Sequence, residues 1–315
     1  MNSGGERADT ALYGAAALGD DIPARTAASH GWLNNPWRKP RFLQAITWGY
    51  LFWSIVPVII AVIFSFNAGR SRSTWQGFSM RWWYQDPFDS LWHDPTLRTA
   101  MTQTVRLSIL TVILAVPLGT AFAIGIDRWR GRPAAGANFI MLFSFVVPEI
   151  ILGVSLFLSF SYLLKSLVPE LGTTAQVLGL VTFQLSYPFI IVRARLLTIG
   201  PEYEEAAMDL GGTPSQALRR VLLPLLSPAI LASVALVLAD TVDNFVTVRY
   251  LSGAADTEPL SVKIYSAARS APTPAVNAAA TVMLVATLLV ISLGWAVYKR
   301  LNRGQGGDVG SFVDL

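Results

Sequence analysis

Long stretches without a charged residue alternate with short charged segments along this chain of 315 residues. Residues 42–69 contain no Asp, Glu, Lys or Arg, and their apolar core Ile46–Phe66 is long enough to cross a bilayer as one helix. Uncharged stretches of comparable length follow at 107–126, 171–192, 221–239 and 270–298. Because about 20 apolar residues span the hydrocarbon layer, the pattern predicts a membrane protein built from helices.

One apolar stretch has a different length. Residues 133–164 hold a single charge, Glu149, which makes the stretch too long for one untilted helix and too short for two helices with a loop. Proline removes a backbone donor and clashes with the preceding turn, so we expect one span that is broken near Pro148. Such a break is tolerated only where protein or a water-filled cavity covers it, and this span is therefore expected to line a wet space.

We predict an all-α membrane protein with six spanning helices in a domain of residues 39–303. The expected spans lie at about 42–66, 104–126, 137–160, 173–195, 224–248 and 277–298. Residues 1–38 and 304–315 are expected to form cytoplasmic tails. The first tail should be flexible, since it is rich in Ala, Gly, Ser and Asp and lacks the basic start of a signal peptide.

Basic residues predict the orientation of the spans. The segments on the side of the two termini carry 13 Lys and Arg residues, whereas the longer loops on the other side carry nine. The positive-inside rule places both termini in the cytoplasm. In the outer loop 67–106, several aromatic residues interleave with polar ones, which suits rings at a membrane surface. Packing of these rings within the loop and docking of a partner are equally compatible with the pattern.

Composition excludes several classes of function. Only 14% of residues are charged and no long basic run occurs, which argues against nucleic-acid binding. With no Cys and two His residues, thiolate metal sites and most covalent or metal chemistry are excluded, and no nucleophile-base constellation indicates an enzyme. None of the four lysines follows a glycine, so no phosphate-binding loop of the Walker A type is present.

The cytoplasmic segment 199–224, between the fourth and fifth spans, is expected to form two short helices. Pro201 suits a first helical turn, and three glutamates follow it where the helix dipole favours negative charge. The first helix should end at Gly211 or Gly212. Thr213 and Gln216 then form a capping-box sequence, which opens a second helix leading into span five.

This segment resembles the EAA signature of the membrane subunits of binding-protein-dependent ABC importers. The match consists of Glu205-Ala206-Ala207, three residues, Gly211, nine residues, Val221, one residue and Leu223-Pro224, with Val221 standing where the family usually has Ile. The resemblance implies the MetI-like fold of type I importer permeases. It also implies that residues 201–211 form a coupling helix, which sits in a groove on a separate ATPase subunit. The small side chains of Ala206 and Ala207 would permit that close approach.

The residues assigned to coupling are Glu202, Glu205, Ala206, Ala207, Asp209 and Gly211. The resemblance further implies that this chain is not an enzyme and binds no cofactor or metal, and that ATP and Mg are used by a partner ATPase dimer. The other implied partners are a second homologous permease, an extracytoplasmic binding protein and membrane lipid, in a bacterial inner membrane. No nucleic-acid partner is expected.

The resemblance covers about residues 40–303 and is strongest to the C-type permease of spermidine/putrescine importers, which works beside a B-type subunit. The motifs that carry it are Trp75-Gln76-Gly77-Phe78, Pro148-Glu149-Ile150, Asp243-Asn244, Val262-Lys263-Ile264-Tyr265 and Pro274-Ala275-Val276-Asn277-Ala278. Relatives commonly have Asp at the position of Glu149 and an Asp pair at Asp243-Asn244. Ferric iron, an opine or a phosphonate therefore remain alternative cargoes to a polyamine.

Charged residues inside spans are costly and often mark a pathway. Asp240 and Asp243 lie one helical turn apart and, with Asn244, are expected on one face of span five. The candidate pathway residues are Glu149, Tyr187, Asp240, Asp243, Asn244 and Asn277. Carboxylates and aromatic rings are the surface that a flexible polycation needs.

Other roles fit the same residues. The two aspartates could pair with arginines of a partner permease, Glu149 could cap the broken helix, and Tyr187 and Asn277 could serve helix packing. An ion-coupled secondary transporter would also use buried acids, as a proton relay, although it leaves the EAA segment unexplained.

Overall fold

The computed structural model describes residues 41–71, 74–129, 131–166, 168–269 and 273–301, and both predicted tails lie outside these ranges. The described part divides after Val58 into two units, and each is described by itself. Helix α2 (Arg41–Phe64) begins in the first unit and runs on through Pro57. Its apolar sequence is long enough to cross a bilayer.

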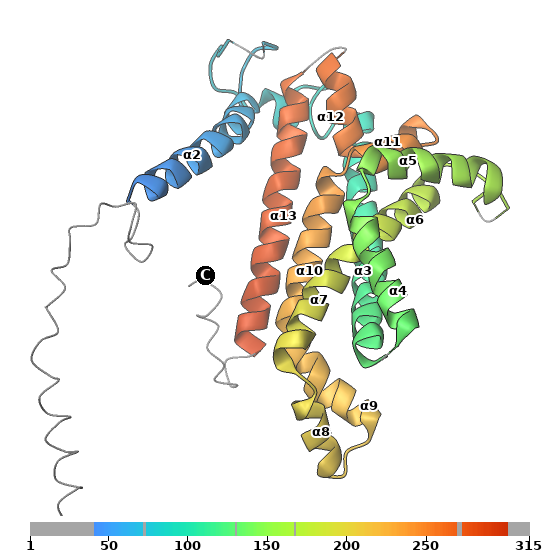
Figure 1. The fold of residues 1–315 in the computed structure, drawn as a ribbon. Coiled ribbons are helices and arrows are strands. Elements are labelled where there is room, and N and C mark those ends of the chain that lie inside the picture. Colours follow the sequence, from blue (N-terminus) through green and yellow to red (C-terminus); the bar gives the residue numbers. More distant parts are fainter. Residues whose placement is uncertain (1–40, 72–73, 130, 167, 270–272, 302–315) are drawn as a thin grey trace, which may run out of the picture. The chain divides into compact units, whose positions relative to one another are not determined.

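The second unit, from Ile59 onward, is built from helices (Figure 1). The helices are α3 (Pro95–Arg128), α4 (Arg132–Val146), α5 (Glu149–Leu158), α6 (Thr173–Gln184), α7 (Ser186–Ile199), α8 (Glu202–Asp209), α9 (Pro214–Ala217), α10 (Leu223–Asp243), α11 (Val246–Leu251), α12 (Leu260–Arg269) and α13 (Pro274–Leu301). Short π-helical or 3₁₀ turns are η1 (Arg81–Gln85), η2 (Ser159–Leu163), η3 (Leu218–Leu222) and η4 (Ala255–Thr257). Within the described ranges, β pairing is limited to a single bridge between Asn67 and Phe78.

Five helical segments in the described residues are long and apolar enough to cross a membrane: Phe42–Phe64, Pro95–Arg128, Thr173–Ile199, Pro214–Asp243 and Pro274–Arg300. A sixth crossing is possible through the bent pair Ala134–Val146 and Glu149–Leu163. The all-α fold class predicted from the charge pattern is therefore confirmed.

Helix α3 begins nine residues before the predicted span, at Pro95 rather than at 104. The Asp94 side chain accepts hydrogen bonds from the backbone N–H groups of Thr96 and Leu97, and Pro95 occupies the first turn, where its missing donor costs nothing. The difference arises because the apolar run marks the part of a helix inside the membrane, whereas capping residues mark where the helix itself begins.

The helix pair α4 and α5, at the position of the predicted third span, is broken where the sequence predicts a break. Val147 and Pro148 are both extended, with ψ of 128° at each, and helices α4 and α5 on either side meet at a bend of 105°. A residue before proline is driven out of the helical region by the proline ring, which explains the conformation of Val147. Glu149 is then the first residue of α5.

The predicted end of span five is wrong. Helix α10 stops at Asp243 rather than continuing to 248, and a second break at Asn244 and Phe245 separates it from α11. Asn244 has ψ of 122°, its backbone N–H donates to the Asp240 carbonyl, and its own carbonyl accepts from the Ser261 hydroxyl at 2.6 Å. The N–H bond is the ordinary helical one and φ of Asn244 is −56°, so helical geometry holds up to this residue. The ψ value and the bond from Ser261 to its carbonyl turn the chain out of the helix directly after it.

Helices α3, α7 and α10 pack side by side and form the centre of the second unit (Figure 1). One buried cluster joins Ala123 and Ile126 of α3 to Phe189 and Val192 of α7, together with Leu226 of α10. Closer to the N-terminal end of α3, Gly119 faces Pro188 of α7. A methyl group on Gly119 would lie 2.5 Å from the proline Cγ and 2.8 Å from the Leu185 carbonyl oxygen. Only glycine permits the two helices to approach so closely.

A polar network joins helices at the opposite end from α8. Gln176 of α6 is fully buried; its amide group donates to Ser252 and to the Thr257 carbonyl, and its carbonyl accepts from Gln103 of α3. The backbone N–H of Leu260, at the start of α12, donates to the Thr104 hydroxyl. Each of these hydrogen bonds replaces one that the buried group would otherwise make with water. The network therefore fixes α3, α6 and α12 in one arrangement.

The loop between α2 and α3 packs partly on itself. Trp82 is completely buried, its indole N–H donates to the Asn67 carbonyl, and the guanidinium of Arg81 lies 4.9 Å from its ring centre. Phe66 stacks between Phe78 and Trp83. Self-packing thus accounts for part of the aromatic pattern, while Phe88 and Trp92 remain exposed.

Substitution of Gly119 tests the contact between α3 and α7. We expect Gly119→Val to lower stability by about 1–3 kcal/mol, because the added side chain must displace backbone and proline atoms. The midpoint of thermal unfolding in detergent measures the effect. Gly125→Ala, on the same helix, is the matched control because a Cβ there meets open space. An equal effect of both substitutions would contradict the close contact.

A second prediction concerns Asp86 in the loop between α2 and α3. Backbone N–H groups of Asp89 and Phe88, followed by the Arg81 guanidinium, lower its pKa from 3.8 to about 2. The folded-state pKa lies below the unfolded value, so the carboxylate contributes stability that is present above about pH 4 and lost as the pH falls toward 2. We expect Asp86→Asn to speed amide hydrogen exchange in residues 82–91 about ten-fold at pH 7.

For the wild type, the same protection, corrected for the intrinsic exchange rate at each pH, should fall between about pH 4 and pH 2, whereas the Asp86→Asn protein should show no such fall. Asp89→Asn is the control. Its pair with Arg70 is solvent-exposed and should contribute little. Identical pH profiles for wild type and Asp86→Asn would contradict the assignment.

Candidate functional site

Asp240 accepts two hydrogen bonds from one neighbouring helical segment. The Tyr187 hydroxyl donates to Oδ1 at 3.1 Å, and the Gln184 amide donates to Oδ2 at 2.9 Å. The Gln184 carbonyl oxygen in turn accepts from the hydroxyl of Thr241, which adjoins Asp240 on α10. Both donors are neutral, so they hold the carboxylate in place without neutralising it.

Aromatic rings stand beside this carboxylate. Phe145 of α4 and Phe183 of α6 each meet the Tyr187 ring edge to face at 5.8 Å between ring centres. The two contacts restrict the Tyr187 ring and bring α4 to the Asp240 site from across the bundle. The tyrosine is thus packed against rings of two helices and hydrogen-bonded to Asp240, as the packing role predicts, while its place in a pathway stays a prediction.

Glu149 forms the second part of the site, at the break of span three. Its Oε1 atom accepts from the amide of Asn244 at 2.7 Å and from the Thr247 hydroxyl at 3.2 Å. As the first residue of α5, Glu149 also lies at the helix terminus that favours negative charge. It therefore joins the broken ends of spans three and five, besides standing at the start of its own helix.

The structure brings most of the candidate pathway residues together. Glu149 and Asp243 are both within electrostatic range of Asp240, although the Asp243 side chain is itself exposed. Asn277, near the start of α13, is joined to these acids by no hydrogen bond in the described part of the chain. The assignment of these residues to a pathway stays a prediction.

Sequence reasoning missed three polar partners, Gln184, Thr241 and Thr247. Gln184 lies one turn before Tyr187, and Thr241 adjoins Asp240. An amide or hydroxyl in the apolar core of a span is a usable signal, because such a group needs a partner in the same layer. The identity of that partner depends on helix packing, which the sequence pattern does not contain.

Within the part of the chain that the structure describes, the carboxylates of the site have no basic partner. In the described ranges no Lys, Arg or His forms an ion pair with Glu149, Asp240 or Asp243; the ion pairs that do form involve acids outside this cluster. An unneutralised carboxylate inside a span is costly and usually faces a cavity, a cargo or a partner chain. The site is therefore suited to binding a cation.

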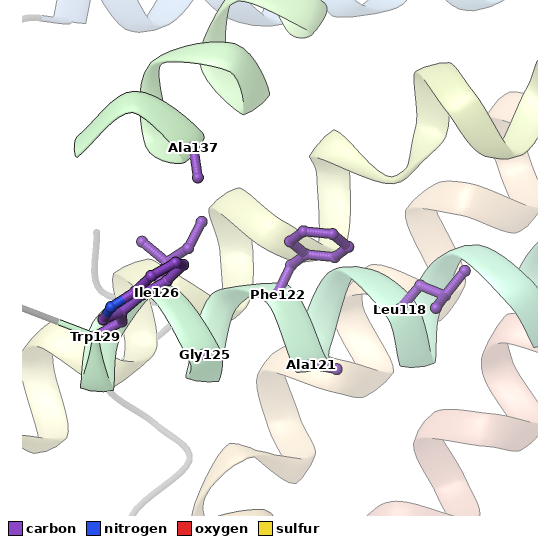
Figure 2. A pocket seen from close by; sticks show the side chains of 7 residues that line it. All are labelled: Leu118, Ala121, Phe122, Gly125, Ile126, Trp129 and Ala137. Atoms are coloured by element: carbon purple, nitrogen blue, oxygen red, sulfur yellow. The ribbon is translucent and has the colours of Figure 1, made fainter. Parts of the chain in front are cut away.

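A separate cavity of about 530 Å³ lies along α3. It is lined by Leu118, Ala121, Phe122, Gly125, Ile126, Trp129 and Ala137. Figure 2 shows the α3 side chains with Ala137 of α4 across the space from them. No titratable group lines this cavity, so it offers no surface for a cation and is distinct from the acidic site.

The predicted coupling segment forms helix α8, which extends below the ends of α7 and α10 in Figure 1. It buries none of its residues, and Leu210, directly after it, is 91% exposed. Gly211 has a φ of +85°, which only glycine adopts readily, and the capping box of Thr213 and Gln216 is present, as predicted.

One ion pair connects α8 to the centre of the unit. The Arg128 guanidinium at the end of α3 binds the Glu204 carboxylate of α8, and the same arginine lies 3.3 Å from Asp127. The other coupling candidates, Glu202, Glu205, Ala206 and Asp209, are exposed, whereas Ala207 is half-buried. Helix α8 is thus exposed, carries small and acidic side chains, and is joined to the end of α3 by the ion pair between Arg128 and Glu204.

Comparison with known families decides what kind of protein carries this site. Residues 115–306 match the family described as "Binding-protein-dependent transport system inner membrane component". The chain belongs to this family. The family predicted from the EAA segment is thereby confirmed, and the chain is a multi-pass permease component of a transport system.

Curated relatives of the permease cover nearly its whole spanning part. The spermidine/putrescine transport system permease protein PotC of Shigella flexneri is 30% identical over 271 residues, which is 85% of this chain and 96% of the relative. The putrescine transport system permease protein PotI of Escherichia coli K12 is 29% identical over 280 residues, covering 88% and 96%. PotC of Haemophilus influenzae is 33% identical over 260 residues, covering 82% and 95%.

Solved structures agree on the fold of the permease. A chain of a bacterial ABC transporter that imports alginate superposes with a TM-score of 0.65 at 17% identity, over 82% of this chain and 96% of that one. A chain of an amino acid ABC transporter gives a TM-score of 0.50 at 23% identity, over 67% and 96%. These similarities confirm the predicted importer-permease fold.

Neutralising Glu149 tests the claim that the acidic site has no counter-ion among the described residues. Oε1 accepts both hydrogen bonds, so Glu149→Gln retains them while removing the charge. We expect the midpoint of thermal unfolding of the permease in detergent to rise by about 2 °C or more. Glu149→Ala is the comparison; it removes the acceptor as well and should lower the midpoint. A lower midpoint for Glu149→Gln would indicate a basic partner.

Proposed function

We propose that this permease carries a polyamine, spermidine or putrescine, into the cytoplasm as part of an ATP-driven importer that works by alternating access. The relatives of about 30% identity that cover most of the chain are named for these cargoes. Family membership favours this function over an ion-coupled secondary transporter, because the family is defined by dependence on a binding protein.

The observation that carries the proposal is the cluster of Glu149, Asp240 and Asp243, which has no basic partner in the described residues. A polyamine supplies positive charges separated by methylene groups. Its ammonium groups would pair with carboxylates, and its methylene groups would lie against rings such as Tyr187 and Phe145. An anionic cargo, such as a phosphonate, would be repelled by the same cluster, which favours the polyamine among the candidate cargoes.

Helix α8 is the proposed contact with a separate ATPase subunit. Glu202, Glu205 and Asp209 would meet basic groups, Ala206 and Ala207 would permit close approach, and Gly211 would end the helix where the surface closes. ATP and Mg would bind to that subunit, since this chain has no Walker A loop. Closing of the ATPase dimer would then pull α8 and expose the acidic site to the outside.

The proposed assembly contains further proteins. A second, homologous permease would complete the passage as a heterodimer, and an extracytoplasmic polyamine-binding protein would deliver the cargo. Both termini would lie in the cytoplasm, as the distribution of basic residues favours. Exposed Asp243 could contact either the cargo or an arginine of the second permease.

Asp240→Asn tests the role of the acidic site in a transporter reconstituted in proteoliposomes with all its subunits. With saturating, spermidine-loaded binding protein, we expect the initial uptake rate to fall about ten-fold, because an ammonium loses its charged acceptor. Thr182→Val is the control: Thr182 is exposed on α6 and its hydroxyl bonds only within its own helix. Wild-type uptake by Asp240→Asn would remove Asp240 from the pathway.

Ala206→Trp tests the proposed ATPase contact. Ala206 is exposed, so the larger side chain should fold normally in this chain and yet obstruct a partner at α8. We expect less ATPase to co-purify with the permease and ATP-driven uptake to be lost. Ser215→Trp, equally exposed on the neighbouring α9, should leave both unchanged. Undiminished association of the Ala206→Trp protein would contradict the contact.

A further inference from the structure

The two broken spans meet at their breaks. Span three breaks at Val147 and Pro148, directly before Glu149, and span five breaks at Asn244 and Phe245. The Asn244 side chain joins the two breaks, because its amide donates to Glu149 Oε1 at 2.7 Å. Helices α5 and α11 also pack together, with Gly153 facing the Tyr250 ring.

We infer that Asn244 is a latch that holds Glu149 while no cargo is bound, and that an ammonium group of the cargo displaces the Asn244 amide and frees the break in span five. The inference rests on the proposed function, and it assigns to Asn244 a task that a pathway residue alone would not have. In the structure the asparagine amide takes the position of a cation at the carboxylate.

The bonds of Glu149 make it open to displacement. Its two donors, Asn244 and Thr247, are neutral, and its Oε2 atom accepts no hydrogen bond in the described residues. An ammonium group carries a full charge and several N–H donors, and charge-assisted bonds to a carboxylate are stronger than neutral ones. A cation that reaches Glu149 will therefore outcompete an amide.

Asn244 itself is poised to change partners. Asn244 is only 7% exposed, and while its amide nitrogen binds Glu149, its side-chain oxygen Oδ1 is buried without a hydrogen-bond partner among the described residues. A buried oxygen without a donor is unfavourable. The bond from the Asn244 amide nitrogen to Glu149 therefore holds the latched arrangement while the oxygen of the same side chain stays without a hydrogen bond. Release from Glu149 would let Asn244 turn and satisfy that oxygen.

The backbone of Asn244 links a change at Glu149 to the second carboxylate, that of Asp240. Its N–H donates to the carbonyl of Asp240 at 2.8 Å, and its carbonyl accepts from Ser261 near the start of α12. A rotation at Asn244 would consequently disturb the last turn of α10, where Asp240 lies. Arrival of cargo at Glu149 would thus alter the hydrogen bonds that Tyr187 and Gln184 donate to Asp240.

Direct binding provides the first test. The permease complex, with both permeases and the ATPase but without the external binding protein, is titrated with putrescine by calorimetry. We expect Asn244→Ala to lower the dissociation constant about three- to ten-fold, because cargo no longer competes with the amide, while the maximal uptake rate of the full transporter falls. Thr247→Val should shift binding in the same direction and less, and Thr182→Val should not.

A purely structural role predicts a different result. Asn244→Ala would then weaken binding or leave it unchanged, and either outcome in a complex with a wild-type unfolding midpoint overturns the latch. If wild-type transporter takes up no polyamine, the proposed function fails and the latch with it. If the wild type takes up putrescine but Asn244→Ala does not bind it more tightly, the latch alone fails.

A distance measurement decides the matter if Asn244→Ala does not assemble. The chain contains no Cys, so spin labels can be placed specifically with Leu158→Cys on α5 and Leu236→Cys on α10, both exposed positions. We expect putrescine to change the distance distribution in the complete complex, and Glu149→Gln to abolish the change. An unchanged distance despite uptake, or the same change with Glu149→Gln, overturns the proposal.

Discussion

Every backbone N–H and carbonyl at membrane depth must find a partner inside the protein, and this requirement governs where the spans of this permease can break. At the first break, the N–H of Val147 still bonds to Phe143, and the carbonyl of Pro148 accepts from Leu152. At the second break, Asn244 bonds through its backbone to Asp240 and Ser261. Both interruptions thus cost few backbone bonds, and both bring a polar side chain to the same place.

The structure combines a fixed part with a part that has few attachments. At one end, buried Gln176 and its partners fasten α3, α6 and α12, and at the centre α3 and α7 touch closely at Gly119. At the other end, α8 is exposed and is held by the ion pair between Arg128 and Glu204. The acidic site lies between these two regions, and its helices are not confined to either end. Such an arrangement suits a transporter in which the α8 end moves while the end fastened by Gln176 stays in place.

Much of the fold followed from simple patterns in the sequence. Charged residues mark the ends of the spans, Pro148 marks the first break, and Thr213 with Gln216 marks a helix start, because each of these effects is local. The family followed from the spacing of Glu205, Gly211 and Leu223-Pro224, a local pattern as well.

The second break could not be predicted in this way. Asn244 leaves the helix because of Glu149, 95 residues earlier in the chain, and Ser261, 17 residues later. Gln184 and Thr247 likewise acquire their roles only through residues on other helices. The presence of acids in the spans was evident from the sequence, whereas their division into a tyrosine-bound and an asparagine-bound carboxylate depended on packing.

The close contact between Gly119 and Pro188 restricts how the central helices can move. With the proline ring seated against a residue that has no side chain, sliding of α3 along α7 would drive neighbouring side chains of α3 into the ring. Tilting about the contact leaves it intact. Relative motion of these two helices is thereby confined to a tilt about Gly119, and a tilt that moves the Arg128 end would strain the hydrogen bond between Gln103 and Gln176 at the other end.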